Sequence, residues 1–232
     1  MVLPALACAA VLIATAALAL AIQDVTRARH VVYGISLVAS SALLVIALLA
    51  LLGVSQTPSA VTLPLGIPWL GARFRLDALS AFFLAVVALG AAAASLFAVG
   101  YGRHEPSPRR VLPFYPAFLA GMSVVVLADD AFTFLVSWEF MSLSSWALVM
   151  AHHRVPDNVR AGYVYLIMAS FGTLALLLMF GLLAGPAGGY AFADIRAGQL
   201  SAGAAAAVLV LALIGAGSKA GLVPLHVWLP LA

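Results

Sequence analysis

The stretch VLPALACAAVLIATAALALAI, from Val2 to Ile22, carries no charged side chain and is as long as a helix that crosses a bilayer. Similar runs recur along the chain, and hydrophobic residues make up 65% of its 232 residues whereas charged residues make up 8%. Soluble domains average roughly 45–50% apolar and about 25% charged residues, so a mean hydropathy of +1.16 excludes a water-soluble globular fold. In lipid, backbone polar groups must be bonded within the chain, and this predicts a bundle of helices.

Seven apolar runs predict seven transmembrane helices in an all-α, polytopic membrane bundle that forms one domain over residues 1–232. The runs are 2–22, 31–53, 78–99, 111–128, 131–151, 161–185 and 201–229. Only Met1 precedes the first run, which lacks the basic start of a signal peptide and is interpreted as an uncleaved helix. Prolines and glycines crowd residues 54–76 and favour an extended loop or a hairpin there.

The arginines flank these runs unevenly. The loops after the first, third and fifth runs hold seven (Arg27, Arg29, Arg103, Arg109, Arg110, Arg154, Arg160), and the other loops hold three (Arg73, Arg75, Arg196). The positive-inside rule then predicts a multi-pass protein of the cell inner membrane with its N-terminus outside, in the periplasm. The net charge of +3 suits contact with anionic lipid, and no basic stripe predicts binding of nucleic acid.

The single cysteine, Cys8, cannot form an internal disulfide, a zinc site or an iron–sulfur cage. We therefore expect no cofactor and no metal. No nucleophile–base set predicts a catalytic centre either, so we expect a non-catalytic membrane subunit.

Two charged side chains lie inside apolar runs: Glu139, and Lys219, which is the only lysine of the chain. A charge at the bilayer centre costs about 2.5–3.5 kcal/mol on insertion-based scales, so such residues are functional by default. Low dielectric disfavours the charged form of each group, whereas each charge favours the other, and a pair balanced in this way can exchange protons. We expect a proton relay, with Ser142 and Ser145 extending a polar seam from Glu139. The alternative is a static ion pair that fixes the two helices.

Residues that interrupt a helix follow Lys219 closely: Gly221, Pro224 and Pro230. Because proline has no N–H, Pro224 removes the usual partner of the Ala220 carbonyl. Broken membrane helices line cavities and mark ion sites in transporters, so we expect the seventh helix to break near Pro224. His226, just beyond, is predicted either to pass the proton onward or to cap and pack.

Other polar residues have simpler interpretations. Asp129 and Asp130 are expected in a solvated turn between two antiparallel helices, with a proton entrance as the alternative. His152 and His153 are expected to be solvated at the membrane surface. Asp77 is expected to cap a helix N-terminus.

Three segments resemble the antiporter-like membrane subunits of NADH:quinone oxidoreductase (complex I), Mrp antiporters and group 4 hydrogenases. They are Leu127–Asp130 followed by Trp138-Glu139 and Ser142–Ser145, the sequence KAGLVPLHVWLP at 219–230, and Asp77–Ser80. The resemblance runs from about Leu76 to the C-terminus. Residues 219–232 are most similar to the B component of hydrogenase-4 and its formate hydrogenlyase counterpart, because other relatives usually have an acid or amide in place of Leu231.

The resemblance implies an antiporter-like fold, of which this chain is the first part, since family members have about fourteen helices in two inverted repeats. It also implies that Glu139 and Lys219 are paired relay residues. The protein would then be a proton-translocating subunit of a redox-driven complex, of the membrane-bound hydrogenase or NADH:quinone oxidoreductase type. Its partners would be other membrane subunits, hydrophilic redox subunits and the bilayer. The alternatives are a stand-alone or Mrp-type cation/proton antiporter subunit, and a structural fragment without transport.

Overall fold

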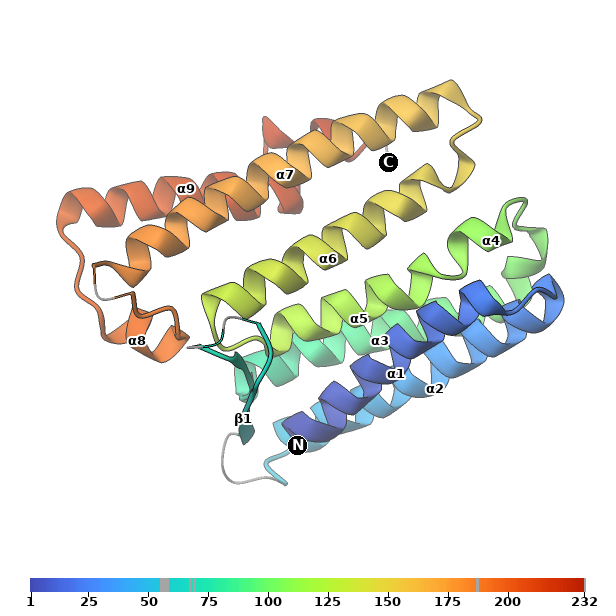
Figure 1. Ribbon diagram of the computed structural model, residues 1–232, viewed down its shortest axis with the longest axis horizontal. Helices are drawn as coiled ribbons and strands as arrows, with labels where there is room; N and C mark the ends of the chain where they lie inside the picture. The colour runs from blue at the N-terminus through green and yellow to red at the C-terminus, as the bar shows by residue number, and fades with distance from the viewer. Residues whose placement is uncertain (55–58, 67, 69, 187, 232) are drawn as a thin grey trace.

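The computed structural model describes residues 1–54, 59–66, 68, 70–186 and 188–231 and forms a helical bundle with one short hairpin (Figure 1). Seven helical segments of the described chain are long and apolar enough to cross a membrane, which confirms the predicted fold class. The elements are α1 (Val2–Ala21), α2 (Val25–Leu51), β1 (Ser59–Leu63), β2 (Ala72–Leu76), α3 (Ala78–Tyr101), η1 (Gly102–His104), α4 (Pro108–Val111), α5 (Phe114–Leu127), α6 (Ala131–Val149), η2 (Met150–His152), α7 (Pro156–Ala184), α8 (Phe192–Ala197), α9 (Ala202–Ala220) and η3 (Leu225–Trp228).

Two helices begin earlier than their apolar runs. Helix α2 begins at Val25 because the Asp24 side chain accepts hydrogen bonds from the backbone N–H groups of Thr26 and Arg27. Helix α7 begins at Pro156, a residue that suits a first helical position because its missing N–H has no helical partner to lose. Arginines expected in loops therefore lie within the first two turns of these helices: Arg27, Arg29 and Arg160.

The long helices form two groups, α1, α2, α3 and α5 in the first and α6, α7 and α9 in the second, and α6 is the helix of the second group that contacts the first (Figure 1). Helices α1, α2, α3 and α5 pack around a core that includes Leu12, Leu43 and Leu84, all buried. Helix α6 packs against α5 on one side and α7 on the other, and α9 packs on α7. Large apolar side chains remain exposed along the outer helix faces, as lipid contact requires.

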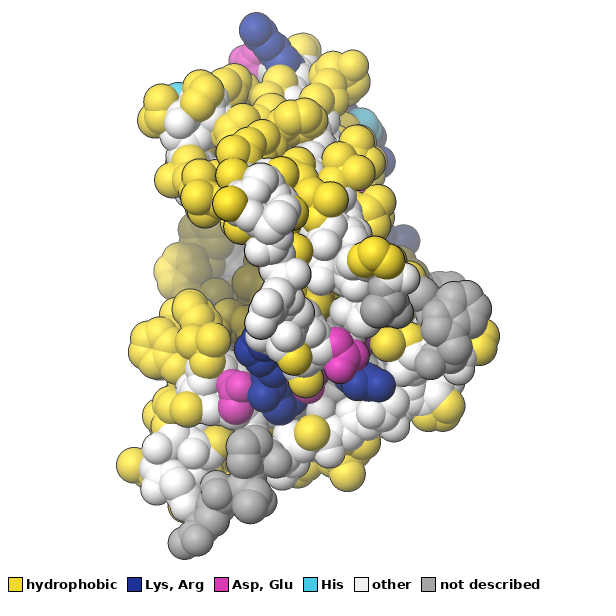
Figure 2. All heavy atoms as spheres, turned by 90° about the vertical axis from the view of Figure 1, so that its left-hand side faces the viewer, with side chains coloured by type: hydrophobic (Ala, Val, Ile, Leu, Met, Phe, Trp, Pro, Cys, Tyr) yellow, Lys and Arg dark blue, Asp and Glu magenta, His cyan; other side chains and the backbone are white. Residues whose placement is uncertain are grey.

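The hairpin expected within residues 54–76 is present. Strands β1 and β2 pair antiparallel, with Ser59 opposite Leu76 and Leu63 opposite Ala72, whereas residues 55–58, 67 and 69 lie outside the described part of the chain. The Met1 ammonium group donates a hydrogen bond of 3.2 Å to the Ser59 hydroxyl, so the N-terminus lies at the hairpin. Figure 2 looks onto the end of the bundle that carries the hairpin, where acidic and basic side chains gather between apolar surfaces.

Candidate functional site

Lys219 lies in the last turn of α9, half-buried, with its ammonium group directed toward α6 and α7. Its Nζ atom donates a hydrogen bond of 3.1 Å to the Ser142 hydroxyl and another to the Tyr165 hydroxyl. The same atom lies 4.8 Å from the centroid of the Tyr165 ring, within the range of a cation–π interaction. Three helices therefore meet at the one lysine of the chain.

Glycine is what lets α9 approach α7 closely enough for these contacts. A Cβ atom on Gly215 would lie 2.6 Å from Cγ of Leu176, closer than real Cβ contacts allow, and 3.0 Å from the backbone oxygen of Gly172, tighter than most of them. Small residues at such contacts are how membrane helices pack without a hydrophobic driving force between them. The glycine pair thereby positions Lys219, one turn further along α9.

Glu139 lies on α6, one turn before Ser142, and is half-buried. Thr173 of α7 donates a hydrogen bond of 2.7 Å to its Oε2 atom, and the same hydroxyl lies 3.1 Å from the Ala169 carbonyl oxygen. A threonine hydroxyl can donate one proton and accept others. If Glu139 is protonated, it can donate to Thr173, whose own proton then turns to Ala169. The site accommodates both protonation states of Glu139.

Glu139 and Lys219 do not form a direct ion pair. Ion pairs in the described chain join Arg75 to Asp77 and Asp129, and His152 to Glu105. The two relay candidates instead contact different hydroxyls on the same helix, α7, and Lys219 also contacts Ser142, on the helix that carries Glu139. The static ion pair considered from the sequence is absent from this arrangement.

Helix α9 ends beside the lysine. Gly221 has φ +75° and ψ +33°, a left-handed conformation that glycine adopts without strain, and its N–H bonds to the Gly217 carbonyl. Pro224 precedes the short helix η3, and Pro230 follows it. Trp228 of η3 folds back and donates its indole N–H to the Ser218 carbonyl at 2.7 Å. The helix therefore breaks at Gly221, and Trp228 bonds one of the carbonyls that the break leaves free.

His226 and Ser145 do not join the contacts around Lys219. His226 is half-buried in η3, and its Nδ1 atom is buried without a hydrogen-bond partner among the described residues. Ser145 is half-buried on α6, one turn beyond Ser142. Their roles in the relay stay predictions.

Two residues of the site were not singled out from the sequence: Tyr165 and Thr173. They lie eight residues apart on α7, which is about two turns, so they share one helix face. A tyrosine and a threonine on one face of a mostly apolar helix are the signal that would have found them.

The link between α5 and α6 is not the solvated turn that was expected. Asp130 is fully buried, and its carboxylate accepts hydrogen bonds of 2.9 Å from the Arg73 N–H and 2.7 Å from the Thr133 N–H. Asp129 forms an ion pair of 3.0 Å with Arg75. The prediction was wrong because the hairpin folds over this link: Arg73 of β2 supplies one of the backbone donors that a buried carboxylate needs, and Thr133 of α6 supplies the other.

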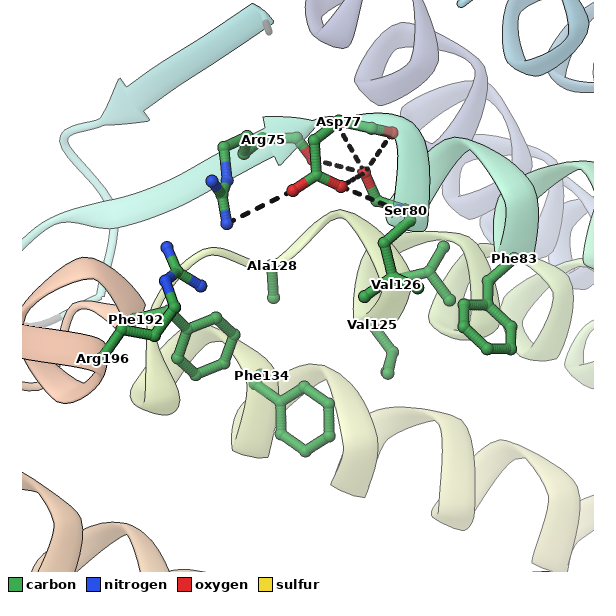
Figure 3. Close-up of a pocket in the computed structure, with 11 residues that line it drawn as sticks. Arg75, Asp77, Ser80, Phe83, Val125, Val126, Ala128, Phe134, Phe192 and Arg196 are labelled. Carbon is green, nitrogen blue, oxygen red and sulfur yellow. Dashed lines mark hydrogen bonds and ion pairs between the residues drawn. The ribbon is translucent and has the colours of Figure 1, made fainter. Parts of the chain in front are cut away.

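A cavity of about 310 Å³ opens beside this link, between β2, α3, α5, α6 and α8 (Figure 3). Arg75 and Asp77 form an ion pair of 3.4 Å at its polar edge, and Phe134 and Phe192 line its apolar wall. Asp77 caps α3 as predicted, in a capping box with Ser80. Burial opposes ionisation of Asp77, but hydrogen bonds from Ser80 and the charge of Arg75 outweigh it and hold the pKa of that carboxyl below its usual value.

Comparison with known proteins matches both the sequence and the fold. The family model described as "NADH:quinone oxidoreductase/Mrp antiporter, TM" matches residues 128–232. Hydrogenase-4 component B of Escherichia coli is 39% identical over 160 residues, covering 68% of this chain and 24% of that protein. NADH-quinone oxidoreductase subunit N of Desulfovibrio desulfuricans is 32% identical over 238 residues, covering 98% of this chain and 45% of that protein.

Among solved structures, the Mrp complex from Dietzia sp. contains a chain that matches with a TM-score of 0.78 and 26% identity, over 99% of this chain and 43% of that one. The present chain thus spans less than half the length of each of these three proteins. The predicted resemblance is confirmed, with hydrogenase-4 component B among the relatives. The chain belongs to the family of antiporter-like membrane subunits found in NADH:quinone oxidoreductase, Mrp antiporters and hydrogenase-4.

Proposed function

We propose that this chain is a proton-translocating membrane subunit in which Glu139 and Lys219 form the relay. The observation that carries the proposal is that the Lys219 ammonium contacts two hydroxyl groups, Ser142 and Tyr165, rather than a carboxylate. A direct ion pair would hold the charge in place, whereas a hydroxyl can accept a proton on one side and release one on the other.

In the proposed relay, the charge of Glu139 controls whether Lys219 keeps its proton. Ionised Glu139 favours the ammonium form, and protonation of Glu139 removes that attraction. Lys219 then passes a proton from Nζ to the Tyr165 oxygen, while the proton of the Tyr165 hydroxyl moves on to water. Water between the Glu139 carboxyl group and the Ser142 hydroxyl completes the proton path along α6. His226 is the proposed next acceptor, since its buried Nδ1 has no partner among the described residues.

We propose further that the subunit works within a redox-driven complex, of the membrane-bound hydrogenase or NADH:quinone oxidoreductase type. Other membrane subunits would flank it, hydrophilic subunits would carry the electrons, and the N-terminus would face the periplasm. Similarity to a hydrogenase-4 component and to an NADH-quinone oxidoreductase subunit supports this assignment. The second candidate is an Mrp-type cation/proton antiporter subunit, which the 26% identity to a chain of the Mrp complex favours.

The test is proton flux through the protein isolated in mild detergent with the subunits that co-purify, reconstituted into vesicles that contain a pH-sensitive dye. A potassium diffusion potential drives the flux, so no electron donor is required. We expect Lys219→Met to lower the flux by about 100-fold, the lower end of what a positioned proton-transfer group contributes. Lys219→Arg should lower it as strongly, because a guanidinium keeps the charge and never releases its proton.

Co-purification of the same subunits with each variant controls for assembly. Flux at the wild-type level in Lys219→Met would remove the lysine from the mechanism. A flux that appears only when a sodium gradient is imposed would favour the antiporter candidate over the redox-driven one.

A further inference from the structure

A second polar cavity, of about 400 Å³, is lined by elements at the end of the bundle opposite the hairpin (Figure 1). Its wall combines the segment leading into α4 with the turn between α6 and α7. Arg110 comes from α4, and His152, His153 and Arg154 come from the turn. Basic side chains from two separate elements thus converge on one cavity at a membrane surface.

Glu105, a carboxylate beside this wall, is already hydrogen-bonded. Glu105 Oε1 lies 2.7 Å from His152 Nε2 and accepts a hydrogen bond of 2.8 Å from the Ser107 N–H. A carboxylate only accepts, so His152 donates from Nε2. Neither Arg110 nor Arg154 has an ion-pair partner among the described residues. The cavity therefore presents two uncompensated guanidinium groups.

A third polar group in the wall also lacks a partner. The Nδ1 atom of His153 is buried and has no hydrogen-bond partner among the described residues. Burying an imidazole nitrogen without a partner is costly unless a ligand or water completes its hydrogen bond. Both histidines were expected to be solvated; the structure has them half-buried, with His153 directed to this wall.

We propose that this cavity binds the phosphate group of an anionic phospholipid. Guanidinium groups match phosphate oxygens in geometry and charge, and an imidazole N–H adds a third donor. The cavity lies where headgroups lie, at the ends of membrane-spanning segments, and exposed Val155 adds an apolar edge beside the acyl region. Basic pockets between membrane helices bind acidic headgroups in this way. A lipid bound here holds the turn that joins α6, which carries Glu139, to α7, which carries Tyr165 and Thr173.

The test counts bound lipids on the full chain by native mass spectrometry in a neutral detergent. Phosphatidylglycerol and phosphatidylcholine are titrated separately against the wild type, Arg110→Gln/Arg154→Gln and Arg103→Gln/Arg160→Gln. The last variant removes the same charge from two exposed arginines that do not line the cavity. We expect the cavity variant to lose affinity for phosphatidylglycerol by about 30-fold, given about 1 kcal/mol for each of the two arginines near an anionic surface. The control variant should stay close to the wild type.

Equal losses of affinity in both variants would mean that binding depends on the net charge of the protein and not on this cavity, which would overturn the proposal. Wild-type affinity in the cavity variant would overturn it too. A third arm adds inorganic phosphate to the wild type before the lipid. Weak competition at millimolar phosphate supports the lipid, whereas phosphate binding as tight as phosphatidylglycerol binding would show that the site takes a free anion.

Discussion

The two helix groups bury their polar side chains in different ways. The group of α1, α2, α3 and α5 buries serines such as Ser36, Ser95 and Ser123, and it buries no charged side chain among the described residues. The group of α6, α7 and α9 contains Glu139 and Lys219, and their hydrogen bonds cross from one helix to another. The first group has the chemistry of a scaffold, and the second has the chemistry of a relay.

Each group contains a hydrogen-bonded tyrosine, and the two tyrosines differ in the charge of their partners. Tyr115 of α5 shares a hydrogen bond of 2.8 Å with fully buried Ser95 of α3, so two neutral groups satisfy each other. Tyr165 of α7 instead accepts a hydrogen bond from the Lys219 ammonium. Neutral pairs stabilise packing, whereas a hydroxyl beside a titratable ammonium can also move a proton.

The largest expected effect comes from adding a methyl group to Gly215 of α9, in the second helix group. Gly215→Ala should destabilise the protein by about 2 kcal/mol, because its Cβ would press on Leu176 and on the Gly172 backbone. It should also lower proton flux, because Lys219 follows one turn later. Thermal unfolding in detergent and vesicle flux measure the two effects.

Gly90→Ala is the matched control in α3, where an added Cβ meets nothing within 4 Å. It should raise stability slightly, by less than about 1 kcal/mol, since alanine is the better helix former. If both substitutions had the same effect, the close contact between α7 and α9 would not be the feature that positions the lysine.

The next largest effect separates the two tyrosines. Tyr165→Phe should lower proton flux about tenfold, equivalent to about 1.4 kcal/mol in the barrier, with little change in unfolding temperature. Tyr115→Phe should lower stability by about 1 kcal/mol, because it leaves the Ser95 hydroxyl unpaired, and should leave flux unchanged. If proton flux fell equally in both variants, the two helix groups would not differ in their roles as scaffold and relay.

The smallest effect concerns Asp77 at the hairpin end. Asp77→Ala should cost about 1 kcal/mol at pH 7 through loss of the helix cap. The folded pKa of Asp77 is lowered, so the charge stabilises the fold above the ordinary carboxyl pKa of about 4 and ceases to do so as the pH falls through the folded value. Asp77→Asn, which keeps a cap, should therefore differ from the wild type in unfolding temperature at pH 7 and approach it at pH 3. A difference that is constant with pH would contradict this.

Much of the fold follows from the sequence because lipid imposes it. Apolar runs predicted the seven helices, and the crowded prolines and glycines of residues 54–76 indicated an extended loop or a hairpin, of which the structure has the hairpin. The helix starts at Val25 and Pro156 were missed because capping extends helices beyond their apolar part into water. The burial of Asp130 was missed because one of its two donors, the Arg73 N–H, comes from the hairpin, which is distant in the sequence.

The candidate site was predictable only where charge stands out against apolar surroundings. Glu139 and Lys219 are conspicuous for that reason, and Ser142 follows from helical spacing. Tyr165 and Thr173 are common residues in membrane helices, and only the rotation of α7 against α6 and α9 gives them partners. Helical spacing fixes which residues share a face, but it does not fix which neighbour that face meets.

The most direct test of the relay uses the fact that the chain contains one lysine. Protein labelled with ¹⁵N-lysine gives a single side-chain amine signal by solid-state NMR, and that signal distinguishes ammonium from neutral amine. At a pH where the wild-type signal is part ammonium and part neutral amine, we expect a larger neutral fraction in Glu139→Gln than in the wild type, and no change in Glu105→Gln. The same neutral fraction in all three proteins would mean that Glu139 does not control the proton on Lys219.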